Sequence, residues 1–209
     1  MTPVEFYFDP ACPWTWITSR WVVDVAEQRG FEITWKTFSL RYHNRENPGY
    51  DWIRERLDLQ LPGLRVIDAA RERFGNDAVG RLYTSFGRLI HYDDDKPLAR
   101  LADGIADAGL PADLIEAGSD SSWDAGIEAS TDAAIGLVGK DAGIPLIVVE
   151  GAKSVFFFGP VLSPAPTGAE AVELWDTFVA LGRFDGLYEI KRTREVGPIL
   201  GPRPVLNAG

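Results

Sequence analysis

The chain has 209 residues and a formal net charge of −10, from 21 basic and 31 acidic side chains. This length suffices for a large core in one domain, or in one domain that carries an insertion. A single cysteine and two histidines exclude an internal disulfide framework and a cysteine-rich zinc site, so we expect no bound metal. The acidic balance argues against a nucleic-acid partner, because binding to phosphates needs clustered Lys and Arg.

Membrane association and secretion are also disfavoured. No segment approaches the roughly 20 apolar residues of a membrane-spanning helix. Residues 1–6 enter a strand pattern at once, without the basic and apolar regions of a secretory signal. We therefore expect a cytoplasmic protein, in whose reducing surroundings a thiol stays free.

The first forty residues predict a β-α-β unit. In residues 4–8, Val and Phe alternate with Glu and Tyr, and both sets are largely apolar, which is typical of a central strand. Residues 13–29 carry apolar side chains at helical spacing, and Gly30 fits a helix C-cap. Residues 31–38 alternate again, so we expect two parallel strands with a right-handed crossover.

A helical block is predicted for the middle of the chain. Residues 42–50 form a polar loop in this interpretation, and apolar residues then repeat at helical spacing as far as residue 142. Pro97 fits the first turn of a helix that ends near Gly109. A further helix is expected from about residue 122 to 142, with Gly143 at its end.

The C-terminal part returns to strands. Residues 146–149 and 155–158 predict an antiparallel hairpin with a turn at Glu150-Gly151, followed by a helix over residues 169–181 and an extended tail from Arg183. The order β-α-β, helical block, β-β-α predicts an α/β protein with one four-stranded sheet into which the helical block is inserted.

Cys12 is expected at the junction between the first strand and the first helix. The free N–H groups and the dipole of a helix start favour an anion there. Pro13 fits the first helical position, which leaves the N–H groups of Trp14 and Thr15 to face the sulfur. Such a setting lowers a cysteine pKa from about 8.5 to roughly 3.5–7.5 and makes the thiolate a nucleophile. Alternatively, Cys12 is a small buried core residue.

Two motifs carry a resemblance to a known family. Cys12-Pro13-Trp14-Thr15 resembles the Cys-Pro-Trp-Cys motif of DsbA-like thioredoxin-fold proteins, and Gly143-Ile144-Pro145 resembles the segment of the cis-proline of that fold. Residues 8–20 (FDPACPWTWITSR) and 158–164 (FGPVLSP) resemble the mycothiol-dependent nitroreductases of that family. These proteins are related to kappa-class glutathione transferases and 2-hydroxychromene-2-carboxylate isomerases.

The resemblance covers nearly the whole chain and implies its organisation. A thioredoxin-like sheet domain would comprise residues 1–42 and residues 143–209, the latter with the C-terminal helix and tail. Residues 43–142 would form the all-helical insertion. The resemblance also implies a homodimer and a low-molecular-weight thiol, mycothiol or glutathione, as cosubstrate.

The motif departs from the family pattern at its fourth position. Thr15 stands where a second cysteine would attack a mixed disulfide, so any redox cycle at Cys12 needs a small thiol to form or resolve that disulfide. The Thr15 hydroxyl either donates to the Cys12 thiolate or is merely tolerated at the helix start. Cys12 and Thr15 are our candidate catalytic residues.

Further residues are implied in binding the thiol. In the resembling fold, the backbone of Ile144 before a cis Pro145 pairs with the bound thiol. Asn44 after the second strand helps to hold it, or is an Asx-turn residue. Gly159 and Val161 supply backbone contacts, or simply form a turn. The expected thiol-binding set is Pro13, Trp14, Asn44, Ile144, Pro145, Gly159 and Val161.

The histidines are additional candidates for a substrate pocket. His43 lies in the polar loop, where a solvated side chain is the alternative. His91 ends an amphipathic helix, where it could instead interact with the helix dipole. Trp14 is expected to stack on a flat substrate, whereas Trp16 is expected in the core.

Three functions remain open. The first is a monothiol thiol-disulfide oxidoreductase that reduces nitroaromatic or other electrophilic small molecules, or disulfides. The second is a transferase- or isomerase-like enzyme in which the bound thiol is the nucleophile, although such relatives carry Ser in place of Cys12. The third is a redox-inactive binding protein.

Overall fold

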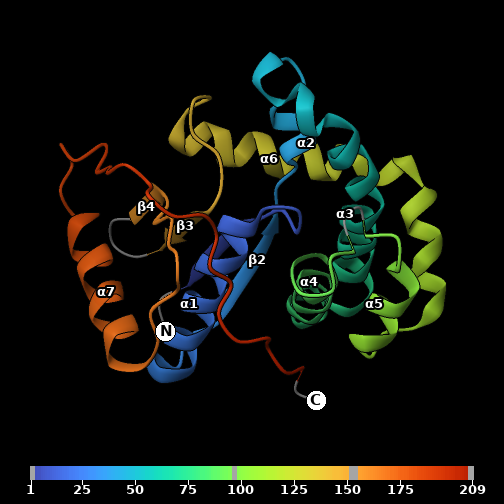
Figure 1. The fold of residues 1–209 in the computed structure, drawn as a ribbon, viewed down its shortest axis with the longest axis horizontal. Coiled ribbons are helices and arrows are strands. Elements are labelled where there is room, and N and C mark those ends of the chain that lie inside the picture. Colours follow the sequence, from blue (N-terminus) through green and yellow to red (C-terminus); the bar gives the residue numbers. More distant parts are fainter. Residues whose placement is uncertain (1–2, 96–97, 151–154, 207–209) are drawn as a thin grey trace.

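The computed structural model describes residues 3–95, 98–150 and 155–206. Within them, a four-stranded sheet lies between helices, in the strand order β2-β1-β3-β4 (Figure 1). The strands are β1 Val4–Phe8, β2 Ile33–Thr37, β3 Leu146–Val149 and β4 Val155–Phe158. Strands β1 and β2 are parallel, and the pairs β1–β3 and β3–β4 are antiparallel. The predicted α/β fold is confirmed.

Strand β1 is central because most of its side chains are apolar on both faces. Phe6 lies opposite Trp35 of β2 and Ile147 of β3. The rings of Phe6 and Phe8 meet Trp35 edge-on, with centroids 5.5 and 5.8 Å apart. This aromatic layer fixes the end of β1, from which the chain continues to Cys12.

Helices α1 (Pro13–Arg29) and α7 (Gly168–Leu181) pack against each other beside the sheet (Figure 1). Trp21 of α1 donates from its indole N–H to Ala171 O at 2.9 Å and packs against Trp175. Gly30 ends α1 in the left-handed region, with φ 68°, as the sequence predicts. The C-terminal helix therefore fixes the position of α1.

Most of a helical block lies on the side of α1 away from α7, and the last helix of the block crosses the sheet and contacts β2 and β4 (Figure 1). The block comprises α2 Leu40–His43, η1 Pro48–Ile53, α3 Arg54–Phe74, α4 Asn76–His91, α5 Leu101–Asp107, η2 Ala112–Ser119, η3 Ser121–Trp123 and α6 Asp124–Val138, where η denotes a 3₁₀-helix. Tyr83 of α4 joins the block to the sheet, since its ring lies 4.0 Å from Phe8 and 5.6 Å from Trp16.

Local predictions for this block need correction. Residues 42–50 are not simply a loop, because α2 and η1 occupy most of the segment. Side-chain caps explain these turns: Ser39 Oγ accepts from Tyr42 N, and Asn47 Oδ1 accepts from Gly49 N.

The helix ends differ as well. Gly139, with φ 92°, ends α6, instead of Gly143. Pro97 and the turn at Gly151 lie outside the described residues. Within those residues, every helix is too short or too polar to cross a bilayer.

Candidate active site

Cys12 is the N-cap of α1, as the sequence predicts. Its backbone is extended, and Pro13 occupies the first turn of the helix. The Thr15 amide donates to Cys12 Sγ at 3.4 Å. Cys12 is 9% exposed, so its sulfur sits at the edge of the core and faces the helix start.

The surroundings of Cys12 nevertheless raise the pKa of its thiol. Burial is the largest influence, and the negative charge of Asp9 acts in the same direction. The hydroxyl and amide of Thr15 and the amide of Trp14 lower the pKa. The lowered pKa expected from the helix start is therefore wrong for the free protein, because removal of the sulfur from water outweighs the donors around it.

The burial comes from distant parts of the chain. Trp14 packs, half-buried, against the cluster around Cys12. This cluster contains Tyr7, Cys12, Phe38, Ala134, Ile144, Leu146 and Val148. Strands β1 and β3 and helix α6 thus enclose the thiol on its inner side. Trp16 is fully buried in the main core, as predicted.

Thr15 is completely buried in the first turn of α1. Among the described residues, its hydroxyl has no hydrogen-bond partner within ordinary geometry. An unpartnered buried donor is costly, and a thiolate beside it would satisfy that donor. The arrangement favours the interpretation in which Thr15 stabilises the ionised sulfur.

Asp9 is a buried carboxylate beside Cys12 that no sequence pattern singled out. Its Oδ1 accepts from Ala11 N and its Oδ2 from Leu40 N, both at 2.9 Å. Cys12 N donates to Asp9 O at 3.0 Å. Burial raises the Asp9 pKa to about 6, although the two amides and Arg56 lower it. The residue organises the turn that presents Cys12 and adds a titratable group beside the thiol.

The helical block holds the two residues that precede Cys12. Arg56 of α3 donates to Ala11 O at 3.1 Å. His91 Nε2 at the end of α4 lies 3.0 Å from Pro10 O. Since a carbonyl oxygen only accepts, this contact places a proton on Nε2. The structure therefore brings His91 to the Cys12 loop.

The cis-proline segment packs beside the thiol, since Ile144 belongs to the same buried cluster as Cys12. The Ile144–Pro145 peptide is cis, which confirms the prediction for this bond. Gly159 has φ +101° and donates its N–H to Pro145 O at 2.7 Å. Thr18 of α1 donates its hydroxyl to Pro160 O at 2.9 Å. These bonds hold the segment that contains Gly159 and Val161 against both the cis-proline and α1.

Asn44 and His43 lie at the end of α2. Asn44 is buried and donates from Nδ2 to Leu40 O at 2.9 Å, so its amide nitrogen stabilises α2. The His43 ring packs against Phe38, with centroids 5.3 Å apart. Burial and the charge of Arg45 lower the His43 pKa, while a backbone bond at Ala142 raises it. The ring is therefore mainly neutral near neutral pH.

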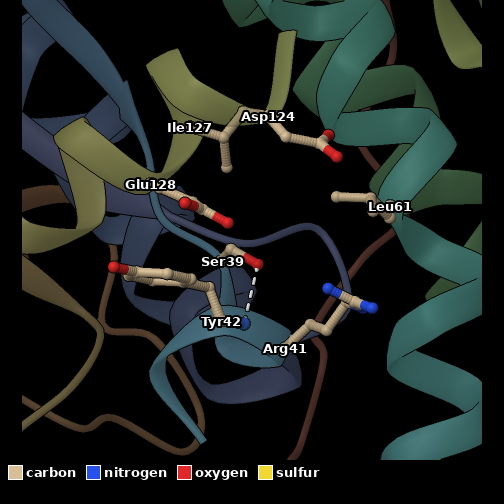
Figure 2. A pocket seen from close by; sticks show the side chains of 7 residues that line it. All are labelled: Ser39, Arg41, Tyr42, Leu61, Asp124, Ile127 and Glu128. Carbon is tan, nitrogen blue, oxygen red and sulfur yellow. Dashed lines mark hydrogen bonds between the residues drawn. The ribbon is translucent and has the colours of Figure 1, made fainter. Parts of the chain in front are cut away.

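Two shallow hollows flank α2. The first, of about 210 Å³ and open to solvent, is lined by Ser39, Arg41, Tyr42, Leu61, Asp124, Ile127 and Glu128 (Figure 2). The second, of about 180 Å³, is lined by Arg41, Asn44, Tyr50, Arg54 and Leu57. Neither includes Cys12, but the second includes Asn44. Among the described residues, no cluster of His, Cys, Asp and Glu could hold a metal ion.

Comparisons with known proteins agree with this geometry. Rv2286c of Mycobacterium tuberculosis is 29% identical over 208 residues, with coverage of 93% of this chain and 83% of the relative. The cytosolic disulfide reductase DsbM of Pseudomonas aeruginosa has a TM-score of 0.60 at 14% identity, over 86% of this chain and 99% of its own. Its structure with GSH has a TM-score of 0.57 at 15% identity, over 86% and 100%. These structures share the DsbA-like thioredoxin fold.

A family model settles the relationship. The model described as Rv2466c-like, mycothiol-dependent nitroreductase Rv2466c, matches residues 11–192. The match contains the Cys12 motif, the helical block, the cis-proline segment and α7. The chain therefore belongs to the Rv2466c-like family of mycothiol-dependent nitroreductases.

Proposed function

We propose that this protein is a monothiol thiol-disulfide oxidoreductase that works with a low-molecular-weight thiol. The observation that carries the proposal is the position of Cys12 at the start of α1, where Thr15 N donates to its sulfur beside the cis Ile144–Pro145 bond. The family assignment supports mycothiol as the thiol, and the structure of DsbM with GSH supports glutathione as the alternative.

The reaction begins with attack of the Cys12 sulfur on a disulfide. A new S–S bond forms to Cys12, the substrate S–S bond breaks, and the leaving thiolate takes the electron pair and the proton from Cys12. The raised pKa of Cys12 makes this proton transfer part of the step. A small thiol then attacks the mixed disulfide, which regenerates the Cys12 thiol and releases a disulfide.

Reduction of a nitroaromatic compound fits the same cycle. Cys12 and one small thiol together supply two electrons and two protons, and the mixed disulfide is the oxidised product. The nitro group becomes a nitroso group with release of one water. A second thiol molecule restores Cys12, so the reaction balances without a second cysteine.

The residues around Cys12 receive roles in this proposal. Thr15 stabilises the thiolate, and Trp14 offers a flat apolar face to the substrate. His43 and His91 border the substrate pocket, where His91 also supports the Cys12 loop. The small thiol is held by Pro13, Trp14, Asn44, Ile144, Pro145, Gly159 and Val161.

A second candidate function is favoured by the raised pKa of Cys12. In a transferase- or isomerase-like enzyme, the bound thiol is the nucleophile and Cys12 only lies beside it. A Cys12→Ser variant mixed with mycothiol and an electrophile separates the two functions. Retained turnover supports attack by the bound thiol, and loss of turnover in a folded variant supports chemistry at Cys12.

The main proposal is tested by intact-mass measurement. We expect folded wild type to gain the mass of one thiol on Cys12 after incubation with mycothiol disulfide or glutathione disulfide, and to lose it when the reduced thiol is added. Cys12→Ser is the matched control and gains no mass. Absence of an adduct in the folded protein, while the urea-unfolded protein reacts, contradicts the proposal and favours a redox-inactive binding protein.

We also propose where this protein acts and how it assembles. A cytoplasmic site of action fits a free thiol, and the structural neighbour DsbM is a cytosolic disulfide reductase. A homodimer is our prediction from the family resemblance, and the exposed Phe156 and Phe158 on edge strand β4 offer an apolar surface for it. Sedimentation velocity measures the mass of the assembly.

A further inference from the structure

The C-terminal segment, residues 183–206, runs extended over α1 and towards α4 (Figure 1). Side chains of other segments anchor its later part. The contacts join Ser163 to Gly197 and Ile199, Tyr92 to Leu200 and Pro202, and Asp93 to Arg203. Leu200 also packs against the main core. These contacts therefore fix the segment after α7 and hold it close to the start of α1.

This path brings Arg194 onto the candidate active site. Its guanidinium carbon lies 5.0 Å from the centre of the Trp14 ring. Trp14 is two residues from Cys12 and packs against the Cys12 cluster. A guanidinium attracted to the face of an aromatic ring makes no hydrogen bond to that ring, so its N–H groups stay available as donors. Arg194 thus presents hydrogen-bond donors beside the tryptophan that borders the thiol.

The charge on Arg194 is not neutralised within the structure. Among the described residues, no carboxylate pairs with Arg194 or with the preceding exposed Lys191 and Arg192, and the following Glu195 forms no ion pair with it. Elsewhere on the surface, arginines usually meet aspartates, as in Arg29–Asp176, Arg73–Asp113 and Arg203–Asp93. In a chain of net charge −10, Lys191, Arg192 and Arg194 are three cations within four residues that form no ion pair among the described residues. The charge of Arg194 lies beside Trp14, which packs against the Cys12 cluster.

We propose that Arg194 is a specificity-determining residue that binds a carboxylate or another anionic group of a substrate at the Cys12 site. The inference rests on the proposed function of Cys12 and adds the class of substrate. A carboxylate can accept two parallel hydrogen bonds from the free edge of a guanidinium. An anionic aromatic disulfide or electrophile would then place its ring near Trp14 and its charge on Arg194.

The test uses one-step reactions of Cys12 with two aromatic disulfides. Dithiobis(nitrobenzoate) carries a carboxylate on each ring, and dithiodipyridine carries no charge. With either reagent, Cys12 loses its proton to solvent and forms an S–S bond to one aryl group, the reagent S–S bond breaks, and the other aryl thiolate leaves with the electron pair. Its absorbance gives the rate for wild type, Arg194→Gln and the matched control Arg192→Gln.

We expect Arg194→Gln to slow the reaction with the carboxylate reagent about fivefold, the size expected for one solvent-exposed charge contact. Its rate with the neutral reagent should not change, and Arg192→Gln should leave the ratio of the two rates as in wild type. The preference of wild type for the anionic reagent should also fall as salt is added.

If both reagents react and Arg194→Gln has the same ratio of anionic to neutral reagent rates as wild type, Arg194 does not bind the anion. The proposed function of Cys12 is then unaffected. A purely structural role of Arg194 would alter both rates by the same factor, which also overturns the inference. If neither reagent modifies folded wild type, Cys12 is not accessible, and both proposals fail.

Discussion

Leu40 N donates to Asp9 Oδ2 at 2.9 Å, which ties the first turn of α2 to the loop that presents Cys12. Asn44 closes the same short helix and lines the hollow beside it. One buried carboxylate therefore links the thiol and a candidate thiol-binding residue, and its ionisation acts on the sulfur.

Replacement of Asp9 should make Cys12 more acidic. Asp9→Asn removes the negative charge that raises the Cys12 pKa, while its side-chain oxygen can still accept one of the two backbone bonds. We expect the rate of iodoacetamide alkylation, measured against pH, to rise at lower pH than in wild type. Asp176→Asn, at an exposed position on α7, is the control and should not alter the profile. A profile moved to higher pH in folded Asp9→Asn contradicts this role.

The same carboxylate should make stability depend on pH. Burial raises the Asp9 pKa from 3.8 to about 6 in the folded protein, so the folded form binds the proton more tightly than the unfolded chain. Between these two pKa values, a rise in pH removes the proton from Asp9 of the unfolded chain before it removes the proton from Asp9 of the folded protein. The contribution of Asp9 to the free energy of unfolding therefore falls by up to about 3 kcal/mol as the pH rises. Urea unfolding at about pH 4 and pH 7 should show a smaller decrease for Asp9→Asn than for wild type. Equal decreases would show that Asp9 is not the group responsible.

Loss of the Thr15 hydroxyl should make Cys12 less acidic. Thr15→Val keeps the shape of the side chain but removes the donor that lowers the Cys12 pKa. Alkylation near neutral pH should slow by roughly tenfold, the contribution of one hydrogen bond to a charged group. Thr15→Ser restores the hydroxyl and should restore most of the rate. Equal rates for the Val and Ser variants would show that the hydroxyl does not act on the sulfur.

Gly159 should not tolerate a side chain. Its φ of +101° is unfavourable for other residues, and an added Cβ would lie 3.3 Å from Val161 N. Gly159→Ala should lower the free energy of unfolding by about 1–2 kcal/mol. In thermal or urea unfolding, the control Gly136→Ala should instead stabilise the protein by about 0.5–1 kcal/mol, because Gly136 lies within α6 and its Cβ would meet no atom within 4 Å. Similar effects of the two substitutions would contradict this account.

Local patterns were sufficient to predict much of the fold. The alternation around Phe6, the helical spacing after Pro13 and the glycine at position 30 are short-range features, and the structure places β1, α1 and the end of α1 accordingly. The helix start also locates Cys12 correctly. The caps formed by Ser39 and Asn47 were missed because they stabilise turns too short to show an apolar period.

The electrostatics of the site could not be predicted in the same way. The pKa of Cys12 depends on burial by residues such as Ile144 and Val148, which are far away in sequence. Asp9 becomes a buried acceptor only when Leu40 N, 31 residues later, reaches it. Arg194 lies over Trp14 only because of the path of the extended tail, and the sequence of this tail has no periodic pattern from which that path could be predicted.

Thr15 in place of a second cysteine determines which disulfides this protein can form. With one cysteine in 209 residues, the chain cannot store oxidising equivalents in a bond within itself. Each disulfide-bonded copy is a covalent complex with another molecule, so the fraction of such copies follows the supply of that molecule. Disulfide-bonded protein isolated from a cell would still contain, on Cys12, the molecule with which it last reacted.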